Sequence, residues 1–365
     1  MAKKSKKRLV FFGYTMDMGG AERALINVLN VLIKYFEIDL FLIKAEGVLM
    51  DDIPKGVNVH AIRKNTFIYA LFRYIPFFRK RIINKLTGVK KYDIAVAFME
   101  GRAATWLVDM KQDCKKIGWI HNDVSKFDIG ISEKEIRDTY SKLDRVVVVS
   151  KHSMDSFIEK YGIDKSRVEV VYNLIDEEGI IKKANKFSVE KNKFTFVNVA
   201  KMRPQKRHDR LLEAVSKLKE EGFDFEVLLI GNGPLESEIK EQISKLEIED
   251  YVKLLGLQTN PFPYIKNSDY FVMSSDHEGY PLTLLESLIL KTPVVTTDVS
   301  GAFEILNGDK YGFICDVSLE ALTAEMRKVL INKDKHIKVV QNNLKEYKGA
   351  NAGIVEQLKE LFDIK

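Results

Sequence analysis

Residues 270–297 read YFVMSSDHEGYPLTLLESLILKTPVVTT, and they contain the unit from which we predict the fold. The apolar run YFVMSS predicts a buried strand, the segment from Pro281 to Leu290 has the period of a helix, and PVVTT predicts another strand. A strand, a crossover helix and a second strand form the βαβ unit of a parallel sheet. Proline is tolerated in a first helical turn, so Pro281 suits the predicted helix start.

The same alternation runs through most of the chain. Strands are predicted at RLVFFGY, IDLFLI, VNVHAI, YDIAVAF, KIGWIH, RVVVVS and VEVVYN, and the pattern restarts with FTFVNVA, EVLLIG, VKLLG, YFVMSS, PVVTT and GFIC. Nearly continuous apolar strands with helices between them are typical of parallel sheets buried on both faces. The predicted fold is α/β, with two Rossmann-like domains that face each other across a cleft.

The domain boundaries follow from a charged stretch without a strong strand in the middle of the chain. We expect an N-terminal domain over residues 1–175, a linker over 176–193 and a C-terminal domain over 194–345. Residues 346–365 predict a C-terminal helix, for which packing back on the N-terminal domain is one option. The length of 365 residues and the hydrophobic content of 45% suffice for two separate cores.

Composition excludes several classes of protein. The net charge of +6 is mild and no known nucleic-acid-reading motif occurs, so nucleic acid is not expected as a partner. Cys114 and Cys315 form no CxxC, which argues against a disulfide framework or a zinc site. Neither a membrane-spanning run nor a signal peptide is predicted, so we expect a cytoplasmic protein.

The segment SSDHEGYPLTLLES, residues 274–287, carries the strongest chemical signal. Glu278 follows the strand and Glu286 lies within the helix, so the two carboxylates can contact different parts of one elongated ligand. Gly279 allows a close backbone approach, and the backbone N–H groups from Tyr280 to Leu284, Leu282 among them, suit an anion. Taken alone, the two glutamates also fit a helix cap and a surface residue.

Further candidate residues follow other strands. A basic loop in VNVAKMRPQKRHDRLLEAV supplies Lys201, Arg203 and Lys206, which can bind phosphate or form a solvated turn. Glycine turns follow two strands, and a histidine ends a third: Gly19 and Gly20 in TMDMGGAER, Gly231 and Gly233 in IGNGPL, and His121 in WIHND. The GG pair is not a dinucleotide-binding G-x-G-x-x-G, and a lone histidine is more often structural.

From about Leu9 to Leu330, these motifs resemble the retaining glycosyltransferases of GT-B fold with an E-x7-E signature, the glycosyltransferase family 4 type that includes many bacterial polysaccharide enzymes. The resemblance implies that Glu278 binds hydroxyls of the donor sugar, Glu286 the ribose, and Lys206 and Lys201 the diphosphate, with Arg203 sharing that task. It also implies that His121 lies near the donor sugar, that Gly19 and Gly20 face the donor phosphates and acceptor, that Gly231 and Gly233 lie near the nucleotide, and that Gly301 and Glu304 support the site.

The chain departs from the family pattern in its basic loop. Lys201 stands where the family has arginine, and Ala200 and Arg207 replace two glycines. A lysine neutralises phosphate as a point charge without the bidentate fork of arginine. The resemblance implies a front-face substitution in which a donor phosphate oxygen accepts the proton of the acceptor hydroxyl, and no catalytic base is identified. Because the chain has no D-x-D and no histidine cluster, neither a metal nor another cofactor is expected.

The acceptor is suggested by the stretch that begins at Arg63 and ends at Lys91. It holds nine basic residues, six aromatic residues and no acidic residue. It predicts an amphipathic helix, kinked at Pro76, that lies on the inner face of the cell membrane, unless its aromatic residues belong to the core. We therefore expect a polyprenyl- or lipid-linked glycan acceptor and a role in capsule or related polysaccharide synthesis. The alternatives are a non-catalytic glycan- or nucleotide-binding partner of an assembly complex and a GT-B epimerase.

Overall fold

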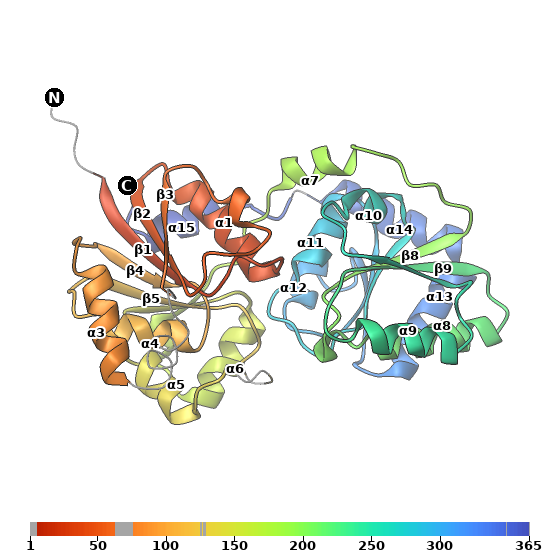
Figure 1. The fold of residues 1–365 in the computed structure, drawn as a ribbon. Coiled ribbons are helices and arrows are strands. Elements are labelled where there is room, and N and C mark those ends of the chain that lie inside the picture. Colours follow the sequence, from red (N-terminus) through yellow and green to blue (C-terminus); the bar gives the residue numbers. More distant parts are fainter. Residues whose placement is uncertain (1–5, 63–75, 125, 127–128, 348, 365) are drawn as a thin grey trace. The chain divides into compact units, whose positions relative to one another are not determined.

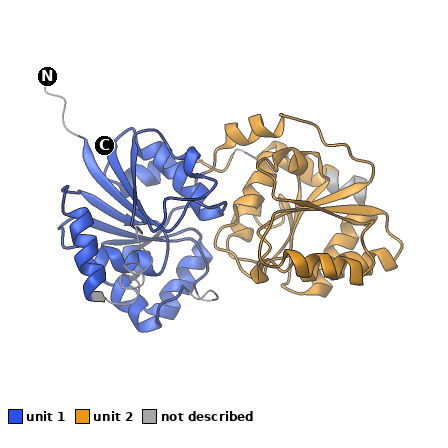
Figure 2. Ribbon diagram, in the orientation of Figure 1, with its two compact units in different colours: residues 1–174, 353–365 blue, residues 175–352 orange. Residues whose placement is uncertain are grey.

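The chain forms two compact units, each built around a parallel sheet (Figure 1). The computed structural model describes residues 6–62, 76–124, 126, 129–347 and 349–364. One unit comprises residues 1–174 and 353–365, and the other comprises residues 175–352 (Figure 2). The prediction of two Rossmann-like α/β domains is confirmed. Among the described residues, no helix is long and apolar enough to cross a membrane.

The first unit has a seven-stranded sheet in the order β3-β2-β1-β4-β5-β6-β7. All of its pairings are parallel. The strands, each of which matches a predicted one, are β1 (Lys7–Gly13), β2 (Phe36–Leu42), β3 (Val57–Ala61), β4 (Ile94–Ala97), β5 (Lys115–Ile120), β6 (Arg145–Val148) and β7 (Val168–Val170).

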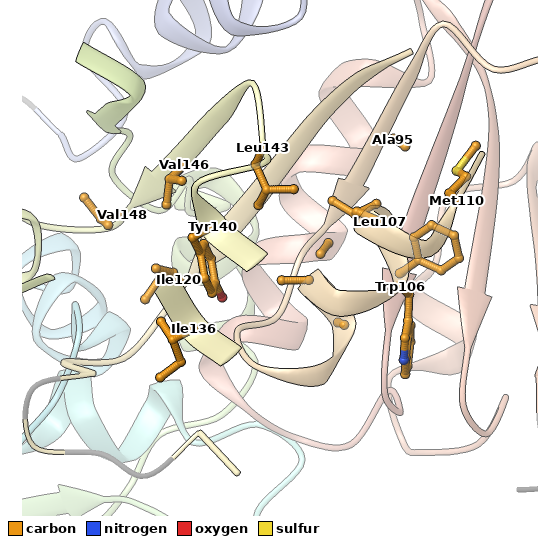
Figure 3. Close-up of a cluster of buried hydrophobic side chains, with 14 of the residues drawn as sticks. Ala95, Trp106, Leu107, Met110, Ile120, Ile136, Tyr140, Leu143, Val146 and Val148 are labelled. Carbon is orange, nitrogen blue, oxygen red and sulfur yellow. The ribbon is translucent and has the colours of Figure 1, made fainter. Parts of the chain in front are cut away.

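Helices cover this sheet and bury its apolar side chains. They are α1 (Gly20–Leu32), α3 (Pro76–Thr87), α4 (Arg102–Asp109), α5 (Glu133–Tyr140), α6 (Lys151–Tyr161) and α15 (Ile354–Leu361), with short 3₁₀ turns η1 (Met50–Asp52) and η2 (Lys165–Arg167). Figure 3 shows part of this core, in which Trp106 and Leu107 of α4 and Tyr140 of α5 lie among strand residues such as Ile120. The rings of Phe12 and Trp106 meet edge to face at 6.0 Å.

The end of the chain completes the opposite side of this sheet. Phe362, which follows α15, is fully buried and lies 6.4 Å from Phe11 and 6.1 Å from Phe36, measured between ring centroids. Phe11 and Phe12 are consecutive strand residues and therefore point to opposite faces of the sheet. The ammonium group of Lys115 also donates a hydrogen bond to the carbonyl of Leu361 at 2.7 Å.

The second unit has a six-stranded parallel sheet in the order β10-β9-β8-β11-β12-β13. Its strands are β8 (Phe194–Val199), β9 (Phe225–Ile230), β10 (Val252–Gly256), β11 (Tyr270–Met273), β12 (Val294–Thr297) and β13 (Gly312–Cys315). Its helices are α7 (Glu177–Ala184), α8 (His208–Glu220), α9 (Glu236–Lys245), α10 (Phe262–Asn267), α11 (Leu282–Ile289), α12 (Ala302–Leu306), α13 (Leu319–Ile331) and α14 (Lys333–Lys345), and the 3₁₀ turn η3 (Pro204–Lys206) precedes α8.

The stretch expected to be a linker contains a packed helix. Helix α7 occupies residues 177–184, and its Ile180 and Ala184 are buried in the core of the second unit. The Asp176 side chain caps its start by accepting a hydrogen bond from the N–H of Gly179. Residues 176–193 are therefore only in part a connection between sheets.

Candidate active site

The strand order of the second unit changes direction between β8 and β11. Strands β9 and β10 continue outward on the side of β8, and β12 and β13 continue on the side of β11. Parallel sheets bind ligands at the carboxyl ends of the strands at such a point, because the loops diverge there. The two loops at this point are residues 200–207 after β8, which we call the basic loop, and residues 274–281 after β11, which we call the acidic loop.

An ion pair joins these two loops. The ammonium group of Lys206 lies 2.6 Å from Oε1 of Glu278, and the two side chains are 21% and 10% exposed. The Ser275 hydroxyl donates a second hydrogen bond to the same oxygen at 2.6 Å, while the Thr297 hydroxyl donates to the Ser275 carbonyl. Within the described part of the chain, Oε2 of Glu278 accepts no hydrogen bond, so a ligand can use it.

Two further cations of the basic loop, Lys201 and Arg203, have no such partner among the described residues. Lys201 is half-buried and Arg203 is exposed. Neither forms an ion pair with a carboxylate among the described residues, in contrast to Lys206. The sequence-predicted cations therefore lie on one loop, two of them with their charge uncompensated.

Helix α11 begins directly after the acidic loop, with Pro281 as its N-terminal flanking residue. Gly279 and Pro281 are buried and Tyr280 is half-buried. The Leu282 side chain, 7% exposed, belongs to the core, so only its backbone N–H can serve a ligand. Glu286 is half-buried in the second turn of α11.

Two glycines bring the turn after β9 against the basic loop. A Cβ atom at Gly231, whose φ is +143°, would lie 1.9 Å from the carbonyl oxygen of Ala200. A Cβ at Gly233 would lie 2.5 Å from the carbonyl oxygen of Met202, whose N–H donates to the Asn232 carbonyl at 2.8 Å. Because neither position has room for a Cβ atom, the backbone of this turn lies directly against the backbone of the basic loop and supports it. The sequence alone did not predict this contact.

In the first unit, His121 lies at the carboxyl end of β5. Its ring contacts Phe98 at 4.6 Å, and neither ring nitrogen has a hydrogen-bond partner among the described residues. Burial lowers the pKa of His121 to about 3, although the Phe98 backbone opposes part of this effect. Both ring nitrogens are buried, and the imidazole is neutral near pH 7, so it has no readily transferable proton.

A buried carboxylate holds the backbone of this strand end. Oε2 of Glu100 accepts a hydrogen bond from the N–H of His121 at 3.0 Å, and its other oxygen accepts one from the Asn122 side chain. The Tyr14 hydroxyl donates to the Glu100 carbonyl at 2.9 Å. Glu100 and Asn122 escaped the sequence analysis because no motif marks them.

Gly19 and Gly20 lie where α1 begins. Gly19 has an extended backbone and flanks the helix, and the Glu22 carboxylate of the first turn lies against it. The first turn of a helix carries backbone N–H groups without partners in the helix, which suit an anion. Gly19, Gly20 and His121 follow strands of the first unit, whereas the other predicted site residues follow strands of the second.

Two parallel α/β units, with polar residues collected after the strands, are the architecture of the GT-B fold. The fold is that of Anabaena HepE, solved in complex with UDP and glucose, with a TM-score of 0.78 and 18% identity over 98% of this chain and 99% of that one. Residues 18–178 match the family described as Glycosyltransferase Family 4, and residues 180–346 match the one described as Glycosyl transferases group 1.

Named enzymes align along nearly the whole chain. The N-acetylgalactosamine-N,N'-diacetylbacillosaminyl-diphospho-undecaprenol 4-alpha-N-acetylgalactosaminyltransferase of Campylobacter jejuni is 28% identical over 93% of this chain and 94% of its own. The UDP-Gal:alpha-D-GlcNAc-diphosphoundecaprenol alpha-1,3-galactosyltransferase of Escherichia coli is 22% identical over 95% of this chain and 93% of its own. The chain belongs to the glycosyltransferases of the family 4 type, and the predicted resemblance is confirmed.

Proposed function

We propose that this glycosyltransferase moves a sugar from a nucleotide-diphospho-sugar to a hydroxyl of a lipid-linked glycan, with retention of the anomeric configuration. The observation that carries the proposal is the contact between Lys206 and Glu278 at the β8–β11 switch point. The names of the two relatives support the substrates, because both contain a diphospho-undecaprenol and one contains a UDP-sugar.

The donor diphosphate is assigned to the basic loop. As the bond from the anomeric carbon to the phosphate oxygen breaks, its electron pair and a negative charge pass to the diphosphate. Lys206, Lys201 and Arg203 stabilise that charge, together with the first N–H groups of α11, and such preorganised charges are strong contributors to catalysis. Gly231 and Gly233 lie in the adjacent turn, near the nucleotide, and from there they hold the basic loop in place.

The sugar and the nucleoside are assigned to the acidic loop and α11. Glu278 accepts hydrogen bonds from sugar hydroxyls and Glu286 from the ribose, while Gly279 and Tyr280 supply backbone contacts. The acceptor oxygen forms its bond to the anomeric carbon on the side from which the diphosphate leaves, and its proton passes to a phosphate oxygen. The first turn at Gly19 and Gly20 faces the phosphates and acceptor, and neutral His121 lies near the sugar.

A transfer assay tests the assignment. Wild-type protein is incubated with a panel of radiolabelled nucleotide sugars and an undecaprenyl-diphosphate-linked acceptor. We expect Lys206→Gln to lower kcat/KM at least about 100-fold, which is the range for loss of a preorganised charge. Lys217→Gln, which removes an exposed lysine of the same unit, should stay within about twofold. Full turnover by Lys206→Gln or by Glu286→Ala would refute the assigned site.

We further propose that α3 brings the enzyme to an anionic membrane surface. Residues 63–75 of the basic aromatic stretch lie outside the described residues, so the helix predicted to precede the kink at Pro76 lies outside them too. Helix α3 begins at Pro76, and Phe77 and Phe78 after it are 70% and 38% exposed. Lys80, Arg81 and Lys85 are exposed on the same helix, so charge and aromatic surface coincide.

Two of the nine basic residues do not belong to that surface. Arg79 is 9% exposed and pairs with Asp109 of α4, which fixes α3 against its neighbour. Lys90 pairs with the buried carboxylate of Asp39 at 2.9 Å. The expectation that the whole stretch faces the membrane is therefore corrected for these two side chains.

Cosedimentation with liposomes tests the membrane proposal. The variant Phe77→Ser/Lys80→Gln/Arg81→Gln should lose binding to phosphatidylglycerol vesicles, since each surface lysine or arginine contributes about 1 kcal/mol. A matched control, Lys134→Gln/Lys142→Gln, removes two exposed charges elsewhere in the same unit and should bind as the wild type does. Binding that survives the triple change would exclude α3 as the docking helix.

A further inference from the structure

Arg207, at the end of the basic loop, has an unusual backbone. Its φ and ψ are 48° and 49°, in the left-handed region that favours glycine. The other described non-glycine residues with positive φ, Glu247, Lys291, Asn307 and Asp363, follow the ends of α-helices, where this conformation is common. Arg207 instead precedes α8 directly, between the turn η3 and the helix.

The side chain of Arg207 joins two carboxylates. Its Nε and Nη2 atoms donate to Asp209 at 3.0 and 2.8 Å, and Nη1 donates to both oxygens of Asp276 at 3.1 and 3.2 Å. The hydrogen bond to Asp209 is the main cause that raises the pKa of Arg207. Burial alone would raise the pKa of Asp209, but Arg207 outweighs it and the pKa falls.

Asp276 is a fixed anchor in the acidic loop. It accepts a hydrogen bond from Nη2 of Arg210 at 2.6 Å, and Arg210, 5% exposed, also donates to the Ser274 carbonyl at 2.7 Å. The N–H of Asp276 also donates to the carbonyl of Gln205, in the basic loop, at 2.8 Å, which adds a backbone contact between the two loops. The contact between Arg207 and Asp276 therefore ties the end of the basic loop to a point that α8 holds in place.

This tie differs from the other ion pair between the loops. Lys206 and Glu278 are both assigned to the donor, so their contact must be shared with the donor once it binds. Arg207 and Asp276 have no donor assignment and can keep their contact throughout the reaction. We propose that Arg207 is a positioning residue: through Asp276 it holds residues 201–206 against the acidic loop, so that Lys206 stays aligned with the donor diphosphate.

This inference rests on the proposed function and is tested with Arg207→Gly. Glycine adopts the same backbone without strain, so the variant removes the tie and keeps the fold. We expect the Kd for UDP, measured by calorimetry, and the KM for the nucleotide sugar to rise about tenfold, because misplacement of a binding group weakens every contact it makes. The kcat should also fall, by about tenfold, because Lys206 stabilises the charge that develops on the diphosphate. The effect of Arg207→Lys should fall between, since it keeps the charge without the fork.

Glu247→Gly is the control, because it places glycine at another left-handed residue of the same unit, one that is exposed. It should leave the Kd, the KM and the kcat unchanged. A Kd for UDP in Arg207→Gly equal to that of the wild type would overturn the inference. If Arg207→Gly does not fold, an unchanged Kd in Arg207→Lys overturns it instead. A wild-type protein that binds none of UDP, GDP, ADP and dTDP would refute the proposed function itself, and this inference with it.

Discussion

Replacement of Gly231 by alanine should damage the second unit far more than the same change at Gly222. Both glycines have positive φ, +143° and +82°. A Cβ at Gly222 meets nothing within 4 Å, whereas one at Gly231 lies 1.9 Å from the oxygen and 2.9 Å from the carbon of the Ala200 carbonyl. The pair therefore compares a Cβ atom in open space with one that meets backbone atoms.

A residue with a Cβ atom pays about 1–2 kcal/mol in the left-handed region, and the cost at Gly231, whose φ of +143° lies farther from that region, is at least as large as at Gly222. At Gly231 the Ala200 backbone must also move by more than about 1 Å to reach an ordinary contact distance. That movement breaks the hydrogen bond from the Ala200 N–H to the Ile230 carbonyl, 3.0 Å long, at a cost of about 1 kcal/mol. With overpacking strain of about 1–2 kcal/mol added, Gly231→Ala should be less stable than Gly222→Ala by about 2–3 kcal/mol.

Scanning calorimetry of the full chain measures this difference. For a unit of this size, about 2–3 kcal/mol corresponds to a Tm lower by about 5–10 °C in Gly231→Ala than in Gly222→Ala. Because Ala200 precedes Lys201, the Gly231→Ala protein should also bind UDP more weakly, while Gly222→Ala should not. Equal Tm values for the two variants would refute the reasoning, because they would mean that the basic loop moves away from the new methyl group without a loss of stability.

Three further outcomes are expected. Folding lowers the pKa of His121 from 6.5 to about 3, so as the pH falls the imidazole is protonated in the unfolded chain before it is in the folded one. The free energy of unfolding should therefore decrease as the pH falls from about 6.5 towards 3, by up to about 1.4 kcal/mol per pH unit. Urea unfolding at pH 7 and pH 5 should show a smaller decrease for His121→Gln than for the wild type. Asp39→Asn breaks a buried network and should cost about 3 kcal/mol in urea unfolding, whereas the exposed Asp138→Asn costs little. Ser275→Ala and Ser287→Ala each remove a buried hydroxyl, but only Ser275→Ala should lower kcat/KM, by about tenfold, and equal activities would refute the role of Ser275 in holding Glu278.

The strands were predictable because a strand that is buried on both faces requires a nearly continuous run of apolar residues in the sequence. Runs such as VVV in β6 and VLLI in β9 admit few polar residues, and each predicted run overlaps a strand. Helix α7 has a weaker apolar pattern, since only its residues Ile180 and Ala184 are buried and charged residues surround them in the sequence. Its stability comes from packing against α10 and α11, which a local pattern does not record.

The motif residues of the site were predictable, but their partners were not. Lys206 and Glu278 could be named separately, and the rule for parallel strand ends suggested that they converge. The contacts from Arg207 and Arg210 to Asp276 join residues 69 and 66 positions apart, and no spacing in the sequence encodes them. The low pKa of His121 likewise depends on burial by Phe98 and Trp119, which only the tertiary structure brings together.

The two ion pairs between the loops have different roles in donor binding: the pair of Lys206 and Glu278 is shared with the donor, and the pair of Arg207 and Asp276 holds the loops together. Lys206 needs an anionic partner while the diphosphate is absent, because its side chain is only 21% exposed, and Glu278 serves as that partner. When a diphosphate takes over this role, Glu278 loses a charge contact but gains the sugar hydroxyls, so neither group is left buried without a partner. The exchange would also loosen the loops if it were their only ionic contact. The contact between Arg207 and Asp276 removes that difficulty, which explains why a side chain rather than glycine can be tolerated in a left-handed backbone at this position.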